Sequence, residues 1–393
     1  MNRRRFFQIF SGLSIAALPG WWRSAGSRRS DRVAVVGGGI VGASIAYHLA
    51  RRGASVTLLE KEAPAAGATR NSFAWINATF SKQPRHYFEL NRLGMEAWRQ
   101  VEGEFSGAFQ VRWGGSLEWY GEARSAQELR QQVARHQQWG YAAHLIDDAE
   151  FARLEPNVVP GPVQAASYST YEGAVDPVHA VEVYLKKAAE AGARVESPCE
   201  VTGVDIRWGR LAGVRTTRGS VDADVLVIAC GVDTPRLAGL AGIEVPLQDS
   251  PGLLAHTEPL PEAIRRVVLA PGAHLKQKPD GRIVTGVGFG GDPGTDNSRE
   301  NGERMLKEAE RFLPQLKNSR LERVTLGWRP LPKDGYPVVG FVEGSPDIYL
   351  AVMHSGITLS ALVGRLAAVE ILDGARVDLL EPYRLSRFRA ATS

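Results

Sequence analysis

The order of apolar and polar positions near the start of the chain predicts a strand, a helix and a second strand in close succession. Residues 33–36 form a short apolar run that is typical of a buried strand. Residues 43–52 follow with helical character and end at Gly53. Residues 55–59 form a second strand, which leads directly to Glu60. This alternation of strand and helix is typical of α/β proteins.

The pattern changes further along the chain. Residues 91–138 are polar, with recurring Arg, Glu and Gln, and favour helices. Residues 241–325 alternate apolar and polar positions as strands do, then end in a charged helix near 299–312. Residues 348–353 predict a buried strand, followed by a Ser-Gly turn and a helix over 357–372. No internal repeat is present.

A glycine motif joins the first strand to the first helix. Gly37, Gly39 and Gly42 have the spacing GxGxxG, and Glu60 lies 23 residues after Gly37. The first glycine allows a tight turn, the second lets the backbone approach a pyrophosphate, and the third lets the helix pack closely on the sheet. An acid at Glu60 is suited to accept hydrogen bonds from ribose hydroxyls and argues against a 2′-phosphate. The predicted dinucleotide site includes Gly37, Gly39, Ile40, Val41, Gly42, Glu60 and Lys61.

Length and charge narrow the class of protein. The 393 residues, 44% hydrophobic and 23% charged, suggest two or three globular units and exclude a disordered chain. The net charge of +4 is misleading, because residues 1–30 contain six arginines and no acid. The remaining 363 residues therefore carry −2, which gives no support for nucleic-acid binding.

The basic N-terminal segment looks like a targeting signal. Arg3, Arg4 and Arg5 precede two phenylalanines and an uncharged stretch over 9–22. This stretch of 14 residues is shorter than the roughly 20 that a membrane span needs. The segment resembles a Tat export signal, so we expect residues 1–30 to direct a folded protein to the periplasm. No A-x-A cleavage site is obvious, so a leader that stays attached to the membrane is an alternative.

Several chemistries lack their motifs. The two cysteines, Cys199 and Cys230, are too few and too far apart for a zinc site or a CxxC redox pair. Both lie in strand-like segments, and we expect two buried free thiols, with a single disulfide between them as the alternative. The sequence has no HExxH motif or carboxylate cluster for a metal, and no GxSxG motif for a serine hydrolase.

Four blocks of the chain resemble the D-amino acid oxidase superfamily of FAD-dependent oxidoreductases. The first is the glycine motif with Glu60 and the segment 67–72, Gly-Ala-Thr-Arg-Asn-Ser. The second is Glu-Gly-Ala-Val-Asp-Pro at 172–177, similar to the family's G-x-V-D-P turn, and the third is the pair of strand segments at 193–204 and 225–231. The fourth block is the most specific. It comprises Gly-Trp-Arg-Pro at 327–330, Asp-Gly-Tyr-Pro at 334–337 and Gly340, and it is followed by His-Ser-Gly at 354–356.

The resemblance implies a fold and a domain arrangement. The fold class is α/β: a Rossmann-like FAD-binding domain of the glutathione-reductase type, interleaved with an α+β substrate domain on a mainly antiparallel sheet. The expected FAD-binding segments are 31–84, 151–240 and 326–378, and the expected substrate-binding segments are 85–150 and 241–325. Residues 379–393 are expected to form a C-terminal tail.

The resemblance also implies that FAD is the cofactor rather than NAD, and that it is bound without a covalent link, since the cysteine used by some relatives has no counterpart near Trp328. The residues expected to contact FAD beyond the glycine motif are Ala68, Thr69, Arg70, Asn71, Ser72, Val201, Gly231, Arg329, His354, Ser355, Gly356, Ile357 and Thr358. The helix that follows Gly356 would direct its positive N-terminus toward negative charge on the reduced flavin.

Four residues are candidates for the chemistry. Arg329 matches the family's carboxylate-binding arginine, and a guanidinium binds a carboxylate with two hydrogen bonds. His274 stands where glycine oxidase has a tyrosine, and shares a strand face with Lys276. Trp75 is expected to wall the pocket. A structural role is the alternative for Arg329, His274 and Trp75.

The expected function is oxidation of an amino acid or secondary amine, with hydride transfer to flavin N5 and hydrolysis of the resulting imine. Alternatives are an FAD-dependent 2-hydroxy acid dehydrogenase and a flavin-binding exported protein without turnover. The electron acceptor is either oxygen or an unknown carrier. Val284 stands where the sarcosine-oxidising branch has an oxygen-activating lysine, which favours a carrier. Membrane contact is expected only through the leader.

Overall fold

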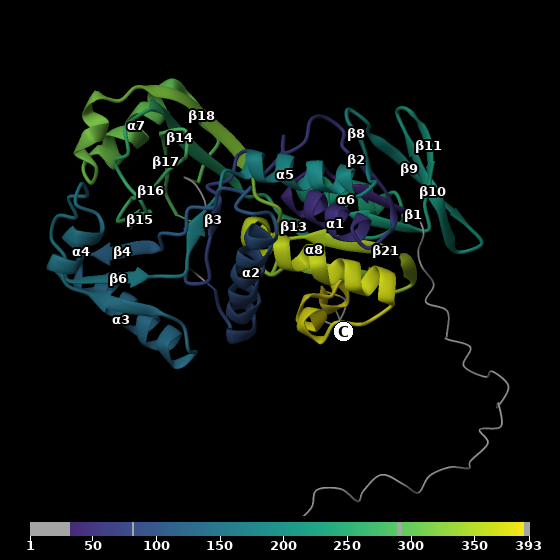
Figure 1. Cartoon of the computed structure of the whole chain (residues 1–393), viewed down its shortest axis with the longest axis horizontal. Coiled ribbons are helices and arrows are strands. Elements are labelled where there is room, and N and C mark those ends of the chain that lie inside the picture. Colours follow the sequence, from purple (N-terminus) through teal and green to yellow (C-terminus); the bar gives the residue numbers. More distant parts are fainter. Residues whose placement is uncertain (1–31, 81, 289–292, 389–393) are drawn as a thin grey trace, which may run out of the picture.

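The computed structural model describes residues 32–80, 82–288 and 293–388, and two large sheets dominate it (Figure 1). The predicted leader at 1–30 lies outside the described residues. Within the described part of the chain, no helix combines the length and the apolar character that crossing a bilayer requires. The overall class is the predicted α/β fold with a parallel sheet and antiparallel sheets.

The first sheet has six strands in the order β20-β21-β12-β1-β2-β8. Its strands are β1 (Arg32–Val36), β2 (Ser55–Leu59), β8 (Arg194–Glu196), β12 (Val225–Ile228), β20 (Val338–Val342) and β21 (Ser345–Val352). All neighbours pair in parallel except β20 with β21. Five of the six strands therefore point the same way, so their carboxyl ends meet at one edge, where open α/β sheets bind ligands.

Alternate residues of β1 enter different cores, because successive side chains of a strand point to opposite faces. Val33 and Val35 pack in the core beneath the helices, while Ala34 and Val36 pack on the other face. The first face is covered by α1 (Ile40–Ala50), α2 (Arg85–Glu104), α5 (Pro177–Glu190) and α8 (Gly356–Asp373). The other face is covered by α6 (Thr234–Gly239) and a three-stranded sheet of β9 (Val201–Arg207), β10 (Arg210–Thr216) and β11 (Gly219–Asp222).

The second large sheet has eight strands in the order β18-β14-β17-β16-β15-β4-β6-β5, all antiparallel neighbours except β15 with β4. Its strands are β4 (Ser116–Tyr120), β5 (Ala143–Ile146), β6 (Ala165–Ser169), β14 (Pro251–Pro259), β15 (Val267–Ala270), β16 (Ala273–Gln277), β17 (Arg282–Gly286) and β18 (Leu321–Trp328). The helices α3 (Ala123–Gln138), α4 (Asp148–Leu154) and α7 (Arg299–Glu310) lie on the side of the molecule that this sheet occupies (Figure 1). Short pairs complete the fold: β3 (Trp75–Ile76) with β7 (Gly173–Ala174), and β13 (Leu247–Gln248) with β19 (Leu331–Pro332).

The structure moves two of the expected segment boundaries. The range 151–240 was assigned to FAD binding, yet β6 pairs with β4 and β5 in the eight-stranded sheet. The range 85–150 was assigned to substrate binding, yet its helix α2 packs on α8, which belongs to the expected FAD-binding segment 326–378. Trp98 Nε1 of α2 donates a hydrogen bond to Ile357 O of α8 at 2.7 Å. Part of the expected tail is also anchored, because Arg384 makes an ion pair with Glu370 of α8. These long-range contacts leave no periodic signal in the local sequence.

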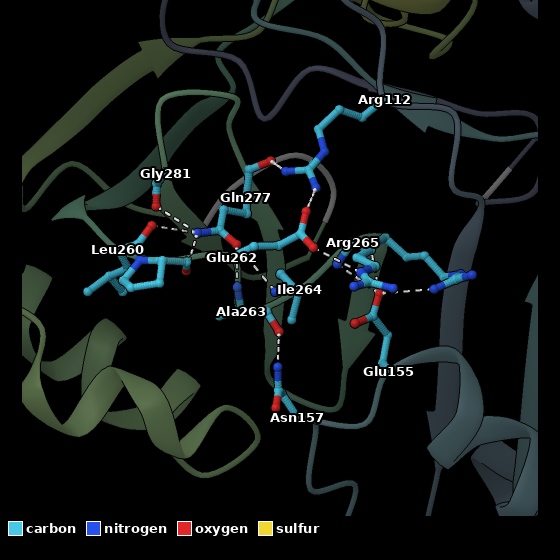
Figure 2. Close-up of polar contacts among 12 residues, drawn as sticks. Arg112, Glu155, Asn157, Leu260, Glu262, Ala263, Ile264, Arg265, Gln277 and Gly281 are labelled. Atoms are coloured by element: carbon cyan, nitrogen blue, oxygen red, sulfur yellow. Dashed lines mark hydrogen bonds and ion pairs between the residues drawn. The ribbon is translucent and has the colours of Figure 1, made fainter.

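Buried polar side chains anchor β16, the strand that carries His274. Figure 2 shows Gln277 at its end, where Oε1 accepts from Ala263 N at 2.8 Å and Nε2 donates to Gly281 O at 2.8 Å. Glu155 accepts a hydrogen bond at 2.9 Å from the backbone N–H of Arg265, which lies in the same segment as Ala263 (Figure 2). Because these buried groups are all paired, the segment before β15 and the end of β16 form one rigid unit.

Both cysteines are free thiols, as predicted. Neither lies in a strand: Cys199 precedes β9 and Cys230 follows β12, so that part of the prediction was wrong. Cys199 is buried and Cys230 is half-buried.

Candidate active site

A long cleft runs across the edge of the six-stranded sheet where β1, β2, β12 and β21 end. Predicted cofactor residues form much of its lining: Gly37, Gly39, Ile40, Val41, Glu60, Lys61, Ala68, Thr69, Asn71, Ser72, Val201, Gly231, His354, Gly356 and Ile357. The cleft therefore unites four segments that are far apart in the sequence.

The glycine motif leaves no room for side chains. Gly37 has φ +109°, and a Cβ there would lie 2.4 Å from Ala229 O. A Cβ on Gly42 would lie 2.0 Å from Gly37 O, so this glycine lets α1 approach the loop. Gly42 was placed in the predicted dinucleotide site, but it does not line the cleft. A Cβ on Gly39 would lie 3.2 Å from Thr69 Oγ1. The loop thus exposes backbone rather than side chains to the cleft, which is what close approach to a pyrophosphate requires.

Side chains of the cleft hold this loop in place. Glu60 Oε2 accepts from Gly38 N at 2.7 Å, and Thr69 Oγ1 accepts from Ile40 N at 3.1 Å at the start of α1. Glu60 follows β2 and lines the cleft, where a ribose would lie beside the phosphate loop. Arg70, which we expected to contact the cofactor, is exposed and lines neither cavity of the site.

A second cavity adjoins the cleft. Both are lined by Ala68, Asn71, Ser72, Gly327, Trp328, Pro330, His354 and Ile357. The second cavity reaches the eight-stranded sheet through Gly252, His274 and Gly286, and is also lined by the predicted residues Trp75, Arg329, Ser355 and Thr358. A flavin ring at the shared wall would therefore face this cavity, while the nucleotide would extend along the cleft.

Arg329 lies where β18 reaches the cavity. Its Nη1 donates to Pro251 O at 2.7 Å and to Ser250 Oγ at 3.1 Å, and burial lowers the pKa of the guanidinium. A Cβ on Gly252 would lie 2.6 Å from Arg329 Nη2, so a glycine at this position makes room for the guanidinium. The cavity thus contains a fixed cation on the side of the eight-stranded sheet.

His274 and Lys276 have different environments although they share a strand face. His274 lines the cavity and meets Phe80 edge-on, with ring centroids 5.6 Å apart. Burial lowers the pKa of His274 to about 4, so its imidazole is neutral near pH 7. Lys276 is buried outside the cavity lining, and its Nζ donates to Val175 O at 3.0 Å. Its partner across the ladder is Val284.

Two further lining residues, Trp75 and Asn77, carry buried polar atoms. Both residues line the cavity. Trp75 Nε1 and Asn77 Oδ1 are buried and have no hydrogen-bond partner among the described residues. Buried polar atoms in proteins are usually paired, so these two atoms are suited to meet a bound ligand. Asn77 was missed by sequence reasoning because a lone asparagine in a loop has no motif.

The N-terminus of α8 is held against α2. A Cβ on Gly94 would lie 2.6 Å from Thr358 O, so this glycine permits the close packing. Ser355 Oγ, directly before the helix, is hydrogen-bonded to two side chains: Lys82 Nζ at 2.6 Å and Tyr87 OH at 2.8 Å. The first turn of α8 contains no acid. Its positive end is therefore available to stabilise negative charge beside it.

Lys82 is the most informative residue that sequence reasoning missed. It lines the cavity, and its side chain is buried. Burial lowers its pKa to about 8, although the nearby Glu172 opposes this shift. The positive charges of Lys82 and Arg329 both lower the pKa of His354, so both cations influence the electrostatic potential at this imidazole. An isolated lysine in the stretch Phe-Ser-Lys-Gln-Pro offered no pattern that could have identified it.

Fold and site together define a dinucleotide-dependent oxidoreductase: a glycine-built cofactor cleft at the end of a parallel sheet, with a substrate cavity under a second sheet. Residues 32–369 match the family described as FAD dependent oxidoreductase, DAO. The chain belongs to this family, and FAD is its cofactor. The cleft fits that cofactor, since its glycines admit backbone contact with phosphates and Glu60 stands where a ribose is expected.

Curated relatives and solved structures match over nearly the whole chain. Glycine oxidase of Bacillus licheniformis is 25% identical over 373 residues, covering 92% of this chain and 99% of its own length. One of the opine oxidase polypeptides of Agrobacterium tumefaciens (strain Ach5) is 26% identical, covering 91% and 97%. The crystal structure of L-proline dehydrogenase from P. horikoshii superposes with a TM-score of 0.83 at 26% identity, covering 92% and 98%.

Proposed function

We propose that this protein oxidises an amino acid or a secondary amine that carries a carboxylate. The observation that carries the proposal is the position of Arg329 in a cavity that adjoins the cofactor cleft. A half-buried guanidinium attracts an anion more strongly than one in water does, and its fork matches the two oxygens of a carboxylate.

The neutral groups of the cavity suit the amine end of such a substrate. His274 is uncharged near pH 7, and Asn77 Oδ1 and Trp75 Nε1 have no partner among the described residues. A neutral imidazole or an amide oxygen can accept an N–H hydrogen bond from an uncharged amine. Bound FAD supplies the hydride acceptor, so the protein's part is to orient the carbon next to nitrogen.

The relatives support the same class of substrate. Two proteins that match over most of their length are a glycine oxidase and an opine oxidase polypeptide, and a third belongs to a sarcosine oxidase. The solved relative from P. horikoshii is named L-proline dehydrogenase. All four names refer to amino acids or their N-substituted derivatives.

An anaerobic titration tests this function. The protein is purified with FAD, and amino acids, N-alkyl amino acids and 2-hydroxy acids are added while the visible flavin band is recorded. Bleaching by an amine, with release of ammonia or an alkylamine, supports the proposal. Bleaching by a hydroxy acid alone would reassign the substrate class, and a flavin that none of them reduces would favour a binding protein without turnover.

Three further properties complete the proposal. Electrons pass more readily to a carrier than to oxygen, which predicts slow reoxidation of the reduced protein in air and fast reoxidation by an added dye. FAD is bound non-covalently, which predicts that acid precipitation releases all the flavin. The leader carries the folded protein to the periplasm, which is tested by fractionating cells that express the full chain and a form without residues 1–30.

A further inference from the structure

A hairpin at one end of the molecule carries a tryptophan where neither turn geometry nor packing favours one. The strands β9 and β10 pair as far as Arg207 and Arg210, and Trp208 and Gly209 form the turn between them. Both turn residues have positive φ angles, +55° and +71°. Hairpin turns of this kind favour Asn, Asp or Gly, and a bulky residue with positive φ is rare. Trp208 is also 100% exposed, so its large apolar side chain is available to another molecule.

The apolar side chains of the hairpin extend from the core toward this tip. Val204 and Leu211 pack against the core on the α6 side of the six-stranded sheet. Ile206 pairs with Leu211 across the ladder and is 47% exposed, and Trp208 follows at the tip. Exposed apolar side chains that are grouped in this way usually mark a surface that binds something.

The hairpin tip lies at the edge of the six-stranded sheet opposite the cofactor cleft. The strand β9 begins at Val201, which lines the cleft. At the other end of the hairpin, Asp347 accepts a hydrogen bond from Leu211 N at 3.1 Å and forms an ion pair with Arg210 at 2.6 Å. Asp347 is near the start of β21, which runs parallel with β12 and β1, so the tip is at the edge where β1 begins. We call this the amino edge; Figure 1 shows the hairpin and β1 at one end of the molecule, away from α3, α4 and α7.

The predicted leader joins the body at the amino edge. Arg32 begins β1 and forms ion pairs with Asp222 at 3.2 Å and Asp224 at 2.6 Å. Only nine residues, 23–31, separate Arg32 from the uncharged stretch over 9–22. Nine residues span at most roughly 30 Å when fully extended. A leader held by a bilayer would therefore keep the amino edge, and with it the hairpin tip, close to lipid.

The charges at this end suit an anionic lipid surface. Four aspartates there are each paired with an arginine: Asp205 with Arg215, Asp222 and Asp224 with Arg32, and Asp347 with Arg210. Arg207 is exposed, and within the described part of the chain it forms no ion pair. The leader adds six arginines and no acid. An indole suits the headgroup region of a bilayer, and arginines are attracted to its anionic lipids.

We propose that the tip of the β9–β10 hairpin, residues 206–210, is a membrane-docking site that inserts Trp208 into the headgroup region of a bilayer containing anionic lipids. The inference goes beyond the proposed oxidation, and only its argument on orientation rests on the proposed leader. It adds a second membrane contact where we had expected the leader to make the only one. The cofactor cleft, at the opposite edge of the sheet, then faces away from the bilayer.

Vesicle flotation of the full, FAD-loaded chain tests the proposal. The vesicles contain phosphatidylcholine alone or with phosphatidylglycerol in a ratio of about 3:1, and the flavin reports the bound fraction. Trp208→Asn should weaken binding to the mixed vesicles at least about tenfold, because the buried indole surface is lost. Arg207→Gln should weaken it about fivefold, with little change on phosphatidylcholine alone. Leu145→Ser changes a similarly exposed apolar residue on β5 of the other large sheet and should have no effect.

Trp208→Asn also separates docking from a structural role. Asparagine is favoured at this turn position, so the variant should unfold at the same temperature as the wild type or at a higher one. Both proteins carry the same leader, so a difference in vesicle affinity between them belongs to the hairpin. Equal affinities would overturn the proposal, and so would a loss of binding that accompanies a lower unfolding temperature.

Quenching by brominated lipid locates the indole. Trp208→Phe keeps an aromatic ring and should bind the mixed vesicles with similar affinity, but brominated acyl chains should quench its fluorescence less than that of the wild type. Equal quenching would show that other tryptophans contact the lipid, and the proposal would fail. It would also fail if the wild type self-associates without binding vesicles and Trp208→Asn does not, since the tip would then join two copies of the chain. None of these results bears on the proposed oxidation, which is read from bleaching of the flavin.

Discussion

The two cavities of this protein recognise their ligands by different means. The phosphate loop of the cofactor cleft presents backbone to the ligand, and its close packing depends on the absence of a Cβ at Gly37 and Gly42. The substrate cavity is built from side chains, with Arg329 and Lys82 approaching from separate elements. Backbone recognition requires glycines at fixed spacing, whereas side-chain recognition can draw on any element that reaches the cavity. The sequence of a site that uses backbone recognition is therefore restricted to one pattern of glycines. The residues of a site that uses side-chain recognition can vary with the substrate.

The largest effect is expected from breaking the backbone site. In Gly42→Val, a Cβ would lie 2.0 Å from Gly37 O, so α1 and the phosphate loop must separate. We expect the affinity for FAD to fall at least about 100-fold, or roughly 2.7 kcal/mol, and the purified protein to be nearly colourless. The ratio of visible to protein absorbance measures this directly.

Gly103→Ala is the matched control for that change. A Cβ on Gly103 meets nothing within 4 Å, and alanine is favourable inside the helix α2. This variant should keep its flavin and its stability. A yellow Gly42→Val protein with the wild-type FAD affinity would show that the loop does not depend on close packing.

The next largest effect concerns the substrate cavity alone. Arg329→Met should retain FAD, because Arg329 lines the substrate cavity and not the cleft. The concentration of a carboxylate substrate needed for half-maximal flavin reduction should rise about 100- to 1000-fold, equivalent to about 3–4 kcal/mol.

Two comparisons sharpen this prediction. An uncharged amide of the same substrate should lose little affinity in Arg329→Met, because it has no carboxylate to pair; equal losses for acid and amide would assign Arg329 a structural role. Gly252→Ala keeps the guanidinium but places a Cβ 2.6 Å from its Nη2, so we expect an intermediate loss for the acid.

A smaller effect follows from the titration of Lys82. Burial lowers its pKa to about 8, so the ammonium dominates below pH 8 and is lost above it. The affinity of the FAD-loaded protein for a simple carboxylate such as acetate should thus be constant from pH 6 to 7 and decrease above pH 8. The nearby titratable groups are Glu172, Tyr87 and His354; burial raises the pKa of Glu172 and of Tyr87 and lowers that of His354. An affinity for acetate that increases above pH 8 would contradict this assignment.

The same contrast explains what could be predicted from the sequence. The strand over 55–59 and the helix of the glycine motif were found at or near their observed bounds, because local periodicity and spacing determine them. The long-range placement of β6 in the eight-stranded sheet and of α2 on α8 has no local signal. Arg70, chosen for its place in a motif, is exposed.

In the substrate cavity, family resemblance identified Arg329 but missed Lys82. The arginine lies in a short signature of glycines and prolines that resembles the family pattern. Lys82 enters the cavity because Glu172, 90 residues further along the chain, pins the preceding loop through Ala78 N and Thr79 N. Such a position depends on tertiary contacts, and spacing along the chain does not reveal it.

The smallest effect is expected at His274, and it separates orientation from charge within the substrate cavity. Burial lowers its pKa to about 4, so the imidazole is neutral from pH 5 to 8 and contributes no inflection there. His274→Gln keeps a hydrogen-bonding side chain of similar reach, and we expect the rate of flavin reduction to fall by about tenfold or less, the worth of one hydrogen bond. The ratio of wild-type to variant rates should stay constant across this range, because ionisation of the substrate amine affects both proteins alike. An inflection near pH 6.5 in the wild type that is absent from the variant would show that the imidazole becomes charged and adds a cation to the cavity.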